Sequence, residues 1–380
     1  MAAAGGQRAF YVDNLRLAMI VLVVLVHCGV TVSGLGSWYF VDPAPKGPLS
    51  LLALVLFQGG CQSFFMGLLF LLAGYFARAS LLKKGRAEFS RGRLVRLGLP
   101  ALFYMVVLNP FMLYWLANVH GIQAQMGFGQ FVAGYFGTGH VLGGSGPLWF
   151  ALALLLFCLI YAAAPAQGSG PARPFSGRLA LGLALFCAAG TFLVRLKWPL
   201  GTSVLNMQLC FFTQYVVYFV WGLAAHKNDW LRTLDPALSR RCLVLAAAGF
   251  VVLGVVVWPV VSSPDMAAAL APYNGGWTWQ AAFLAAWSEA MGVCLSVGLL
   301  GLFRERANGT SPFVQNLTDS AFAVYVFHAP FVVILGRLVV RLEAPALAKF
   351  LVLGALAVPV SFAVGWGVRK VPLLRELVKA

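Results

Sequence analysis

The stretch DNLRLAMIVLVVLVH (residues 13–27) joins a charged beginning to an apolar run that ends in a histidine. At about 1.5 Å per residue, His27 lies roughly 16 Å along a helix from Arg16, near the midplane of a hydrocarbon core about 30 Å thick. An ionisable side chain at that depth normally faces the interior of a helix bundle or a water-filled cavity, and it marks a functional site. The alternative is a histidine that only forms a hydrogen bond to a neighbouring helix.

The composition of the whole chain predicts the same setting for this stretch. Of 380 residues, 61% are hydrophobic and only 10% are charged, and the hydrophobic residues fall in runs of about twenty, the length that crosses a bilayer. We therefore expect an all-α integral membrane protein with about ten transmembrane helices, in a single domain over 1–380 with no appended soluble domain. The expected spans are 17–36, 61–79, 97–117, 147–164, 178–196, 205–225, 241–260, 278–302, 318–340 and 346–367.

The distribution of charge predicts the orientation of the chain. The formal net charge is +16; in a soluble protein this would point to nucleic acid, but here the basic residues gather in alternate connecting segments. If the N-terminus is cytoplasmic, all but six of the 27 Lys and Arg residues lie on the cytoplasmic side. By the positive-inside rule both termini are then cytoplasmic, and we expect the lipid bilayer, and no nucleic acid, as a partner. The six basic residues outside are Lys46, Arg195, Lys197, Arg337, Arg341 and Lys349.

Signals of other protein classes are missing from the sequence. Met1–Ala4 lead into an apolar run long enough to span a membrane, so we expect no cleavable signal peptide. The seven cysteines form no C-x-x-C pair. We therefore expect neither a disulfide framework nor a zinc site, and no metal cofactor.

The segment after the first span contains an aromatic loop and then a short apolar run. Trp38 and Tyr39, in an outside loop over 34–50, are typical of an interfacial aromatic belt. Leu49–Phe57 is apolar but short, so we expect a partly buried or re-entrant helix there, separate from the second span.

Two further connections are predicted from composition. The outside loop over 118–147 has no Lys or Arg but contains His140 and the glycine-rich stretch 143–146. It suits either the entrance for a polar uncharged substrate such as a sugar or a flexible connector. The segment 164–177, with Pro165, Pro171 and Pro174, is predicted to be a cytoplasmic linker.

Arg93 and Arg96 precede the third span in a strongly basic segment. On a helix they are three residues apart and share a face, which suits two guanidinium groups that bind one anion such as a phosphate. The alternative is charge that sets topology and contacts anionic lipid at the inner leaflet.

The later spans contain unusual polar groups. Glu289 is roughly midway through the eighth span, where an unpaired carboxylate would be costly. In the ninth span, which we expect residues 318–320 to cap, Tyr325 and His328 share a face just before Pro330. Two intramembrane histidines and a glutamate at comparable depth predict a central polar cavity.

These motifs together resemble the integral membrane acyltransferase family 3. The resemblance covers nearly the whole chain and rests first on the R-x10-H spacing of Arg16 and His27 and on the R-x-x-R pair Arg93 and Arg96. Supporting pieces are FFMG (64–67), LAGY (72–75), GPLWF (146–150), Glu289, and the stretch from Ser320 to His328.

The resemblance implies a multi-pass enzyme of the bacterial plasma (inner) membrane. Such an enzyme takes an acyl group, acetyl in the first place and succinyl as an alternative, from cytoplasmic acyl-CoA as co-substrate. It passes the group to a hydroxyl of an extracytoplasmic glycan, glycolipid or related acceptor.

Roles for individual residues follow from this chemistry. A neutral imidazole suits the base that takes the hydroxyl proton, and we assign this to His27. Arg16, Arg93 and Arg96 would anchor the phosphates of the donor. The remaining expected site residues are Glu289 as a partner of His27 or a ligand of the acceptor hydroxyl, His328 as an oxyanion donor or a link between spans, and Tyr325, Trp149 and His140 as substrate contacts.

One other class of protein shares these features. A transporter or flippase for a polar lipid or sugar would also have a polar midplane and a basic inner rim. The sequence shows no internal repeat of the kind found in many such proteins, and consumption of acyl-CoA would separate the two classes.

Overall fold

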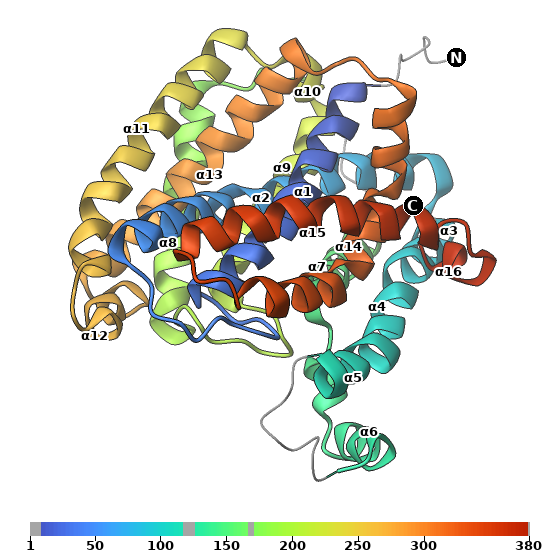
Figure 1. The fold of residues 1–380 in the computed structure, drawn as a ribbon. Helices are drawn as coiled ribbons and strands as arrows, with labels where there is room; N and C mark the ends of the chain where they lie inside the picture. Colours follow the sequence, from blue (N-terminus) through green and yellow to red (C-terminus); the bar gives the residue numbers. More distant parts are fainter. Residues whose placement is uncertain (1–8, 117–125, 166–170, 379–380) are drawn as a thin grey trace.

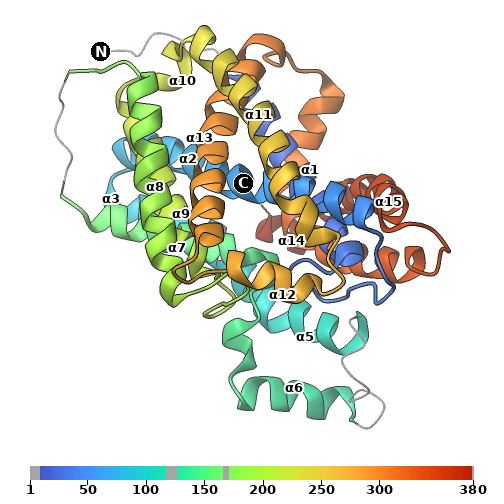
Figure 2. The same ribbon diagram turned by 90° about the vertical axis from the view of Figure 1, so that its left-hand side faces the viewer.

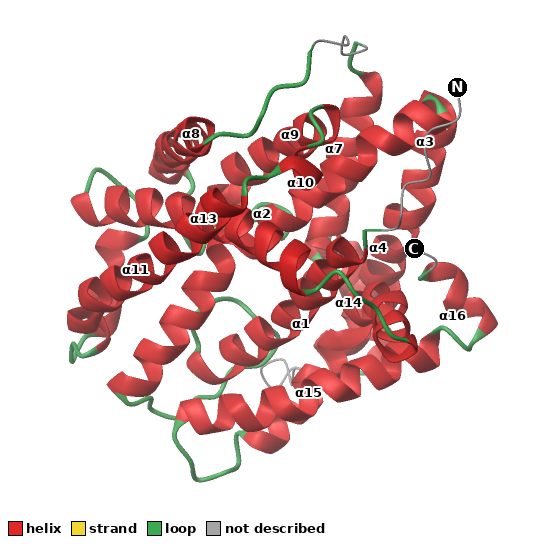
Figure 3. Ribbon diagram, turned by 90° about the horizontal axis from the view of Figure 1, so that it is seen from above, coloured by secondary structure: helices red, strands yellow, loops and turns green. Residues whose placement is uncertain are grey.

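The computed structural model describes residues 9–116, 126–165 and 171–378. Over these residues the chain is built of helices and loops, and its one strand-like feature is an isolated bridge between Val204 and Met207 (Figure 3). Ten helical stretches in the described ranges are long and apolar enough to cross a membrane, which confirms the predicted fold class.

The spanning stretches form most of the molecule (Figure 1). They are α1 (Phe10–Ser33), α2 (Pro48–Lys84), the composite third span (Arg86–Trp115), α7 (Trp149–Ala163), α8 (Gly177–Lys197), α9 (Phe212–Lys227), α11 (Pro236–Val261), α13 (Trp279–Arg306), α14 (Pro312–Val339) and α15 (Ala346–Val368). The short helices are α6 (Phe128–Gly137), α10 (Trp230–Thr233), α12 (Met266–Leu270) and α16 (Pro372–Leu377).

The second span differs from the prediction. The segment Leu49–Phe57, expected to be a separate short helix, is the first part of a continuous 37-residue α2 that begins at Pro48. The helix continues through the polar stretch, and the Gln58 side chain donates a hydrogen bond to Ser33 Oγ on α1. The helix ends at Gly85, whose φ of +77° favours glycine.

The third span is an irregular helix. Its α-helical pieces α3 (Arg86–Arg93), α4 (Leu99–Phe103) and α5 (Asn109–Phe111) alternate with the π-helical turns η1 (Leu94–Gly98), η2 (Tyr104–Leu108) and η3 (Met112–Leu116). Pro100 and Pro110 lie in this span and lack the backbone N–H that a regular ladder needs. It begins earlier than the expected start at residue 97, and residue 117 lies outside the described residues.

α2 and α9 touch backbone to backbone through two glycines. A Cβ added to Gly74 would lie 2.2 Å from the carbonyl oxygen of Phe219, and one added to Gly222 would lie 2.0 Å from that of Leu71. Small residues at such crossings let membrane helices approach closely. The resulting van der Waals contacts stabilise the helix pair, because the hydrophobic effect does not drive helices together within lipid. In Figure 2, α8, α13 and α11 lie side by side on another part of the bundle.

α14 begins before the expected residue 318. Its first residue is Pro312, and the side chain of Ser311 caps it by accepting a hydrogen bond from Val314 N at 3.2 Å. The predicted cap over residues 318–320 therefore lies inside the helix, where Ser320 Oγ bonds the carbonyl of Asn316 one turn earlier. α14 packs against α1 and α15.

The loop between α1 and α2 is fixed to the start of α15. Lys349 Nζ lies 3.0 Å from Asp42 Oδ2, and the two side chains are only 6% and 4% exposed. Lys349 also donates to the carbonyl of Val340, and Asp42 N donates to the carbonyl of Thr31 on α1. These contacts hold the loop over the end of α1.

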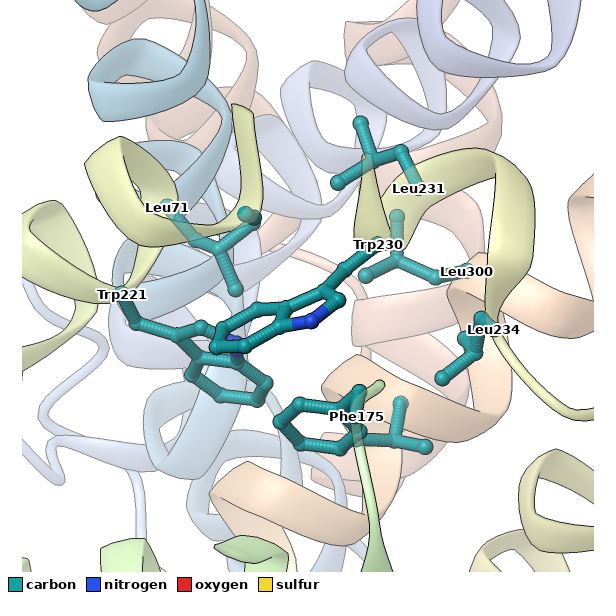
Figure 4. A pocket seen from close by; sticks show the side chains of 9 residues that line it. Leu71, Phe175, Trp221, Trp230, Leu231, Leu234 and Leu300 are labelled. Carbon is teal, nitrogen blue, oxygen red and sulfur yellow. The ribbon is translucent and has the colours of Figure 1, made fainter. Parts of the chain in front are cut away.

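The segment that leads into α8 is anchored by aromatic packing (Figure 4). Phe175 stacks on Trp221 with centroids 5.3 Å apart, and Trp230 meets the ring of Phe175 edge to face. Only a small void of about 10 Å³ remains among these side chains, roughly the room for one water molecule. Residues 166–170 of the predicted linker lie outside the described residues.

Candidate functional site

The two intramembrane histidines meet between α1 and α14. His27 Nδ1 lies 3.0 Å from His328 Nε2, and the rings are nearly parallel, with centroids 5.1 Å apart. The pair places residues from the first and the ninth span in direct contact, at the comparable depth that their positions predict. His328 is 0% exposed, whereas His27 keeps some accessible surface.

A third ring completes this group. Trp38, from the loop after α1, stacks on His27 with centroids 3.8 Å apart and planes 13° apart. The indole therefore covers one face of the imidazole, a contact that the aromatic-belt interpretation of Trp38 does not include. Its pairing with a histidine eleven residues earlier has no periodic signal in the sequence, because Trp38 lies in the loop after α1 and the loop sets its position.

His328 is held by its own helix. Its Nδ1 lies 2.9 Å from the carbonyl oxygen of Tyr325 and 3.1 Å from that of Val324. The phenol of Tyr325, on the same face of α14, donates to the carbonyl of Pro147 at 2.5 Å. Through these bonds the histidine pair is connected to the segment that opens α7.

The segment before α7 is fixed inside the bundle. Gly146 has a φ of +48°, and a Cβ there would lie 2.4 Å from Tyr104 and 2.6 Å from the hydroxyl of Tyr39. The side chain of Asn206 donates to the carbonyl of Gly146 at 2.8 Å and to Ser145 Oγ at 3.0 Å. Ser145 and Gly146 are thus held in place, so the flexible-connector interpretation does not fit this end of the loop. Residues 118–125 of the outer loop lie outside the described residues.

A chain of phenols and an amide supports this segment. Tyr39 donates to Asn109 Oδ1 at 2.6 Å, and Asn109 Nδ2 donates to the hydroxyl of Tyr135 at 3.0 Å. Tyr39 and Tyr104 hydroxyls are 3.1 Å apart. Burial raises the pKa of the Tyr39 phenol, so it keeps its proton and acts as a donor.

We call the side of the molecule where α1 begins and where α2 and α15 end the terminal face. A cavity of about 1190 Å³ opens there. All three arginines predicted to bind a donor lie on its wall, together with other basic residues for which the sequence predicts no role in a site. The basic lining residues are Arg16, Lys83, Lys84, Arg93, Arg96, Arg369, Lys370 and Arg375. This concentration of positive charge suits a polyanionic ligand.

The cavity extends from the terminal face into the bundle. Its deeper wall includes Ile20, Phe150 and Tyr325. Phe150 is near the start of α7, which enters the bundle from the opposite side, and Tyr325 is one helical turn from His328. The cavity thus leads from a basic mouth to the neighbourhood of the histidine pair, although neither histidine lines it.

The basic residues that follow α15 and the one in α16 have no local sequence signal of a site. Arg369 is oriented by a 2.9 Å hydrogen bond to Ser320 Oγ and by Asp319 at 3.6 Å, both on α14. Lys370 lies over the ring of Trp366. In the sequence these residues look like the topogenic charge expected after a last span, and only the packing of α15 against α14 brings them to the cavity.

Glu289 lies in a different polar cluster. Its two carboxylate oxygens each accept a 2.8 Å hydrogen bond, from Thr191 on α8 and from Gln214 on α9, and the residue is 1% exposed. Arg195, also 1% exposed, is close enough to attract the carboxylate. Among the hydrogen bonds of the described residues none joins Glu289 to His27, so this geometry favours a role in packing α8, α9 and α13 together.

Two further expected site residues lie away from the cavity. Trp149 stacks on Tyr215, with centroids 5.6 Å apart. His140 is exposed in a short turn and lies 2.5 Å from Thr138 Oγ1. Neither lines the cavity. Within the described ranges no three His, Cys, Asp or Glu side chains gather in a way that would hold a metal ion.

Comparison with known proteins identifies the family. No curated protein and no solved structure matches the chain. Residues 10–366, which include every membrane-spanning stretch but the last two residues of α15, match the acyltransferase domain of acyltransferase family 3. This match confirms the predicted family and favours an enzyme over a transporter or flippase. The chain belongs to acyltransferase family 3 and is a membrane acyltransferase.

Proposed function

We propose that the protein transfers an acyl group, acetyl in the first place, from cytoplasmic acyl-CoA to a hydroxyl of an extracytoplasmic glycan or glycolipid. The observation that carries this proposal is the cavity with a basic mouth and an apolar interior that leads toward the histidine pair. The family supplies the reaction class, and the cavity supplies a place for a donor with anionic and acyl ends.

The donor fits the cavity by charge and polarity. Arg16, Arg93 and Arg96 at the mouth would bind the phosphates, since guanidinium groups pair with phosphate through two parallel hydrogen bonds. Leu72 and Phe150 offer an apolar wall to the pantetheine arm. Because the terminal face is the strongly basic one, we place it in the cytoplasm, in a bacterial plasma membrane.

His27 is proposed as the general base. As the acceptor hydroxyl oxygen bonds to the thioester carbonyl carbon, the imidazole takes the hydroxyl proton. The tetrahedral intermediate then collapses, the carbon–sulfur bond breaks, and the departing thiolate receives that proton. The products are an acyl ester and free CoA, and the imidazole is restored.

The other expected residues take supporting roles in this proposal. Tyr325, at the deep wall of the cavity, would guide the acyl end past α14. Trp149 and His140 are proposed to contact the acceptor from the opposite side, where α7 begins. Glu289 would stabilise the bundle that carries the site.

The test is incorporation of isotope-labelled acetate into envelope glycans and lipids, measured by mass spectrometry. Cells lacking the protein receive wild type, His27→Asn, or the control His226→Gln at matched membrane levels. We expect a labelled ester with wild type and with His226→Gln and none with His27→Asn. Equal label in all strains, including the strain lacking the protein, would overturn acetyl transfer by this enzyme.

A second measurement addresses the donor. Isothermal titration of coenzyme A against the protein in nanodiscs should show saturable binding to wild type and to His27→Asn. An absence of binding to wild type would overturn the proposed donor, whatever the outcome of the labelling.

A further inference from the structure

We infer that His328 is a positioning residue that fixes the tautomer of His27, so that Nε2 of His27 is the nitrogen that takes the proton. The assignment of the tautomer stands on geometry alone. Its catalytic consequence rests on the proposed function, in which His27 is the base.

The nitrogen of His328 that points away from His27 fixes the tautomer of His328. Its Nδ1 faces two backbone carbonyl oxygens, those of Tyr325 at 2.9 Å and Val324 at 3.1 Å. A carbonyl oxygen only accepts hydrogen bonds, so Nδ1 must have the proton and donate. A buried imidazole without this proton would direct a lone pair at two oxygens, which is unfavourable.

The near nitrogen of His328 is then determined. In a neutral imidazole with a proton on Nδ1, Nε2 has a lone pair and accepts. The atom it faces is His27 Nδ1, 3.0 Å away. This nitrogen must therefore have the proton, because two lone pairs at that distance would repel each other.

The consequence for His27 follows directly. With its proton on Nδ1, a neutral His27 has its lone pair on Nε2. The two nitrogens are 3.0 Å apart while the ring centroids are 5.1 Å apart and the planes differ by 20°, so each nitrogen points toward the other and the N–H can align with the lone pair. The stacked indole of Trp38 restricts rotation of the imidazole and keeps this orientation.

The hydrogen bond between the two histidines also suits the protonated, cationic form of His27. When Nε2 of His27 accepts a proton, its Nδ1–H still donates to His328 Nε2, and the bond strengthens because the donor is now cationic. No proton needs to pass to His328, whose Nδ1–H remains on the carbonyls. His27 can then pass the proton on its Nε2 to the departing thiolate. In serine proteases, where a carboxylate holds the base histidine, imposing the wrong tautomer lowers kcat by about 10⁴-fold.

The direct test is solid-state NMR of the wild-type protein in lipid nanodiscs with ¹⁵N- and ¹³C-labelled histidine. The signals are assigned with His27→Gln and His328→Gln, and His226→Gln is the control for an unrelated histidine. At a pH where the pair is neutral, we expect protonated Nδ1 and bare Nε2 on both rings. A protonated Nε2 on His27 would overturn the inference, and this arm needs neither donor nor acceptor.

The functional test separates positioning from folding. His328→Leu removes the acceptor for His27 Nδ1–H, and we expect kcat to fall by about 10²- to 10⁴-fold, the range of general-base catalysis, with unchanged affinity for coenzyme A. His328→Gln offers an amide oxygen near the position of Nε2 and should retain more of kcat. Wild-type kcat in His328→Leu, or equal losses in both variants with intact coenzyme A binding, would overturn the positioning role.

Discussion

The indole of Trp38 lies flat against the imidazole of His27, with centroids 3.8 Å apart. Stacked aromatic pairs contribute about 0.5–1.5 kcal/mol beyond area burial, and 1.4 kcal/mol corresponds to a tenfold change in rate. We expect Trp38→Ala to lower kcat by roughly tenfold and Trp38→Phe to lower it less, both with unchanged affinity for coenzyme A. Steady-state kinetics check this, and equal kcat values for wild type and Trp38→Ala would contradict it.

Arg93 and Arg91 provide a matched pair of variants that tests the proposed donor site. Arg93 lines the cavity, whereas Arg91, two residues earlier, is exposed and does not line it. Hydrogen bonds to charged groups contribute about 1.5–3 kcal/mol, so Arg93→Gln should weaken coenzyme A binding by roughly 10- to 100-fold. Arg91→Gln removes the same charge and should change the affinity little. Similar losses in both variants would indicate a general effect of charge rather than a binding site.

Gly146 and Gly143 test the packed segment before α7. Gly146 has a φ of +48° and no room for a Cβ beside Tyr104, whereas a Cβ on Gly143 would meet nothing within 4 Å. We expect Gly146→Ala to lower the free energy of unfolding by about 1–3 kcal/mol and to reduce activity. Thermal unfolding in detergent measures this, with Gly143→Ala near wild type. A Gly146→Ala variant as stable and active as wild type would show that the segment relaxes freely.

The buried ion pair of Asp42 and Lys349 should contribute to stability through the loop that bears Trp38. Removing one partner of a buried pair leaves an uncompensated charge and costs about 3–5 kcal/mol. We expect Lys349→Met to lower the unfolding temperature strongly and Asp42→Leu/Lys349→Met to lower it less.

The control for this pair is an exposed one. Lys84 Nζ lies 3.6 Å from Glu88 Oε1, and the two side chains are 37% and 67% exposed. Lys84→Met should therefore lower the free energy of unfolding by less than about 1 kcal/mol in the absence of ligand. An equal effect of Lys349→Met and Lys84→Met would argue against a special role for the buried pair.

A substitution of Glu289 distinguishes a structural role of this residue from a catalytic one. Glu289→Gln places an amide NH₂ against one of its two donors, Thr191 or Gln214, and should cost about 1–3 kcal/mol of stability. We expect activity per folded molecule to stay near wild type. Loss of kcat with unchanged thermal stability would instead support the catalytic role suggested by its depth in the eighth span.

The fold and part of the site follow from the sequence for identifiable reasons. Long apolar runs predict spans because a bilayer imposes both their length and their internal hydrogen bonding. The spacing of Arg16 and His27 predicts their separation in depth because a helix has a fixed rise. The sequence does not predict the long α2, because a polar stretch looks like a boundary until its partner, Ser33 on α1, is known.

Other parts of the site depend on contacts between distant segments. Trp38 reaches His27 because the loop that carries it is held by Asp42, and no periodic pattern encodes that pairing. Glu289 and His328 are both polar residues at intermediate depth, but different neighbours direct them to different clusters. Depth along a helix is therefore predictable here, whereas the face and the partner are set by packing.

The histidine pair joins residues that are 301 positions apart. At the usual pace of synthesis, about 5–20 residues per second, His27 emerges from the ribosome roughly 15–60 s before His328. During that interval the first span is in the membrane without the partner that orients its imidazole. If His328 positions His27 as we propose, a truncated chain that stops before α14 should be catalytically silent even with the arginines of the cavity in place, and activity should appear only near the end of insertion.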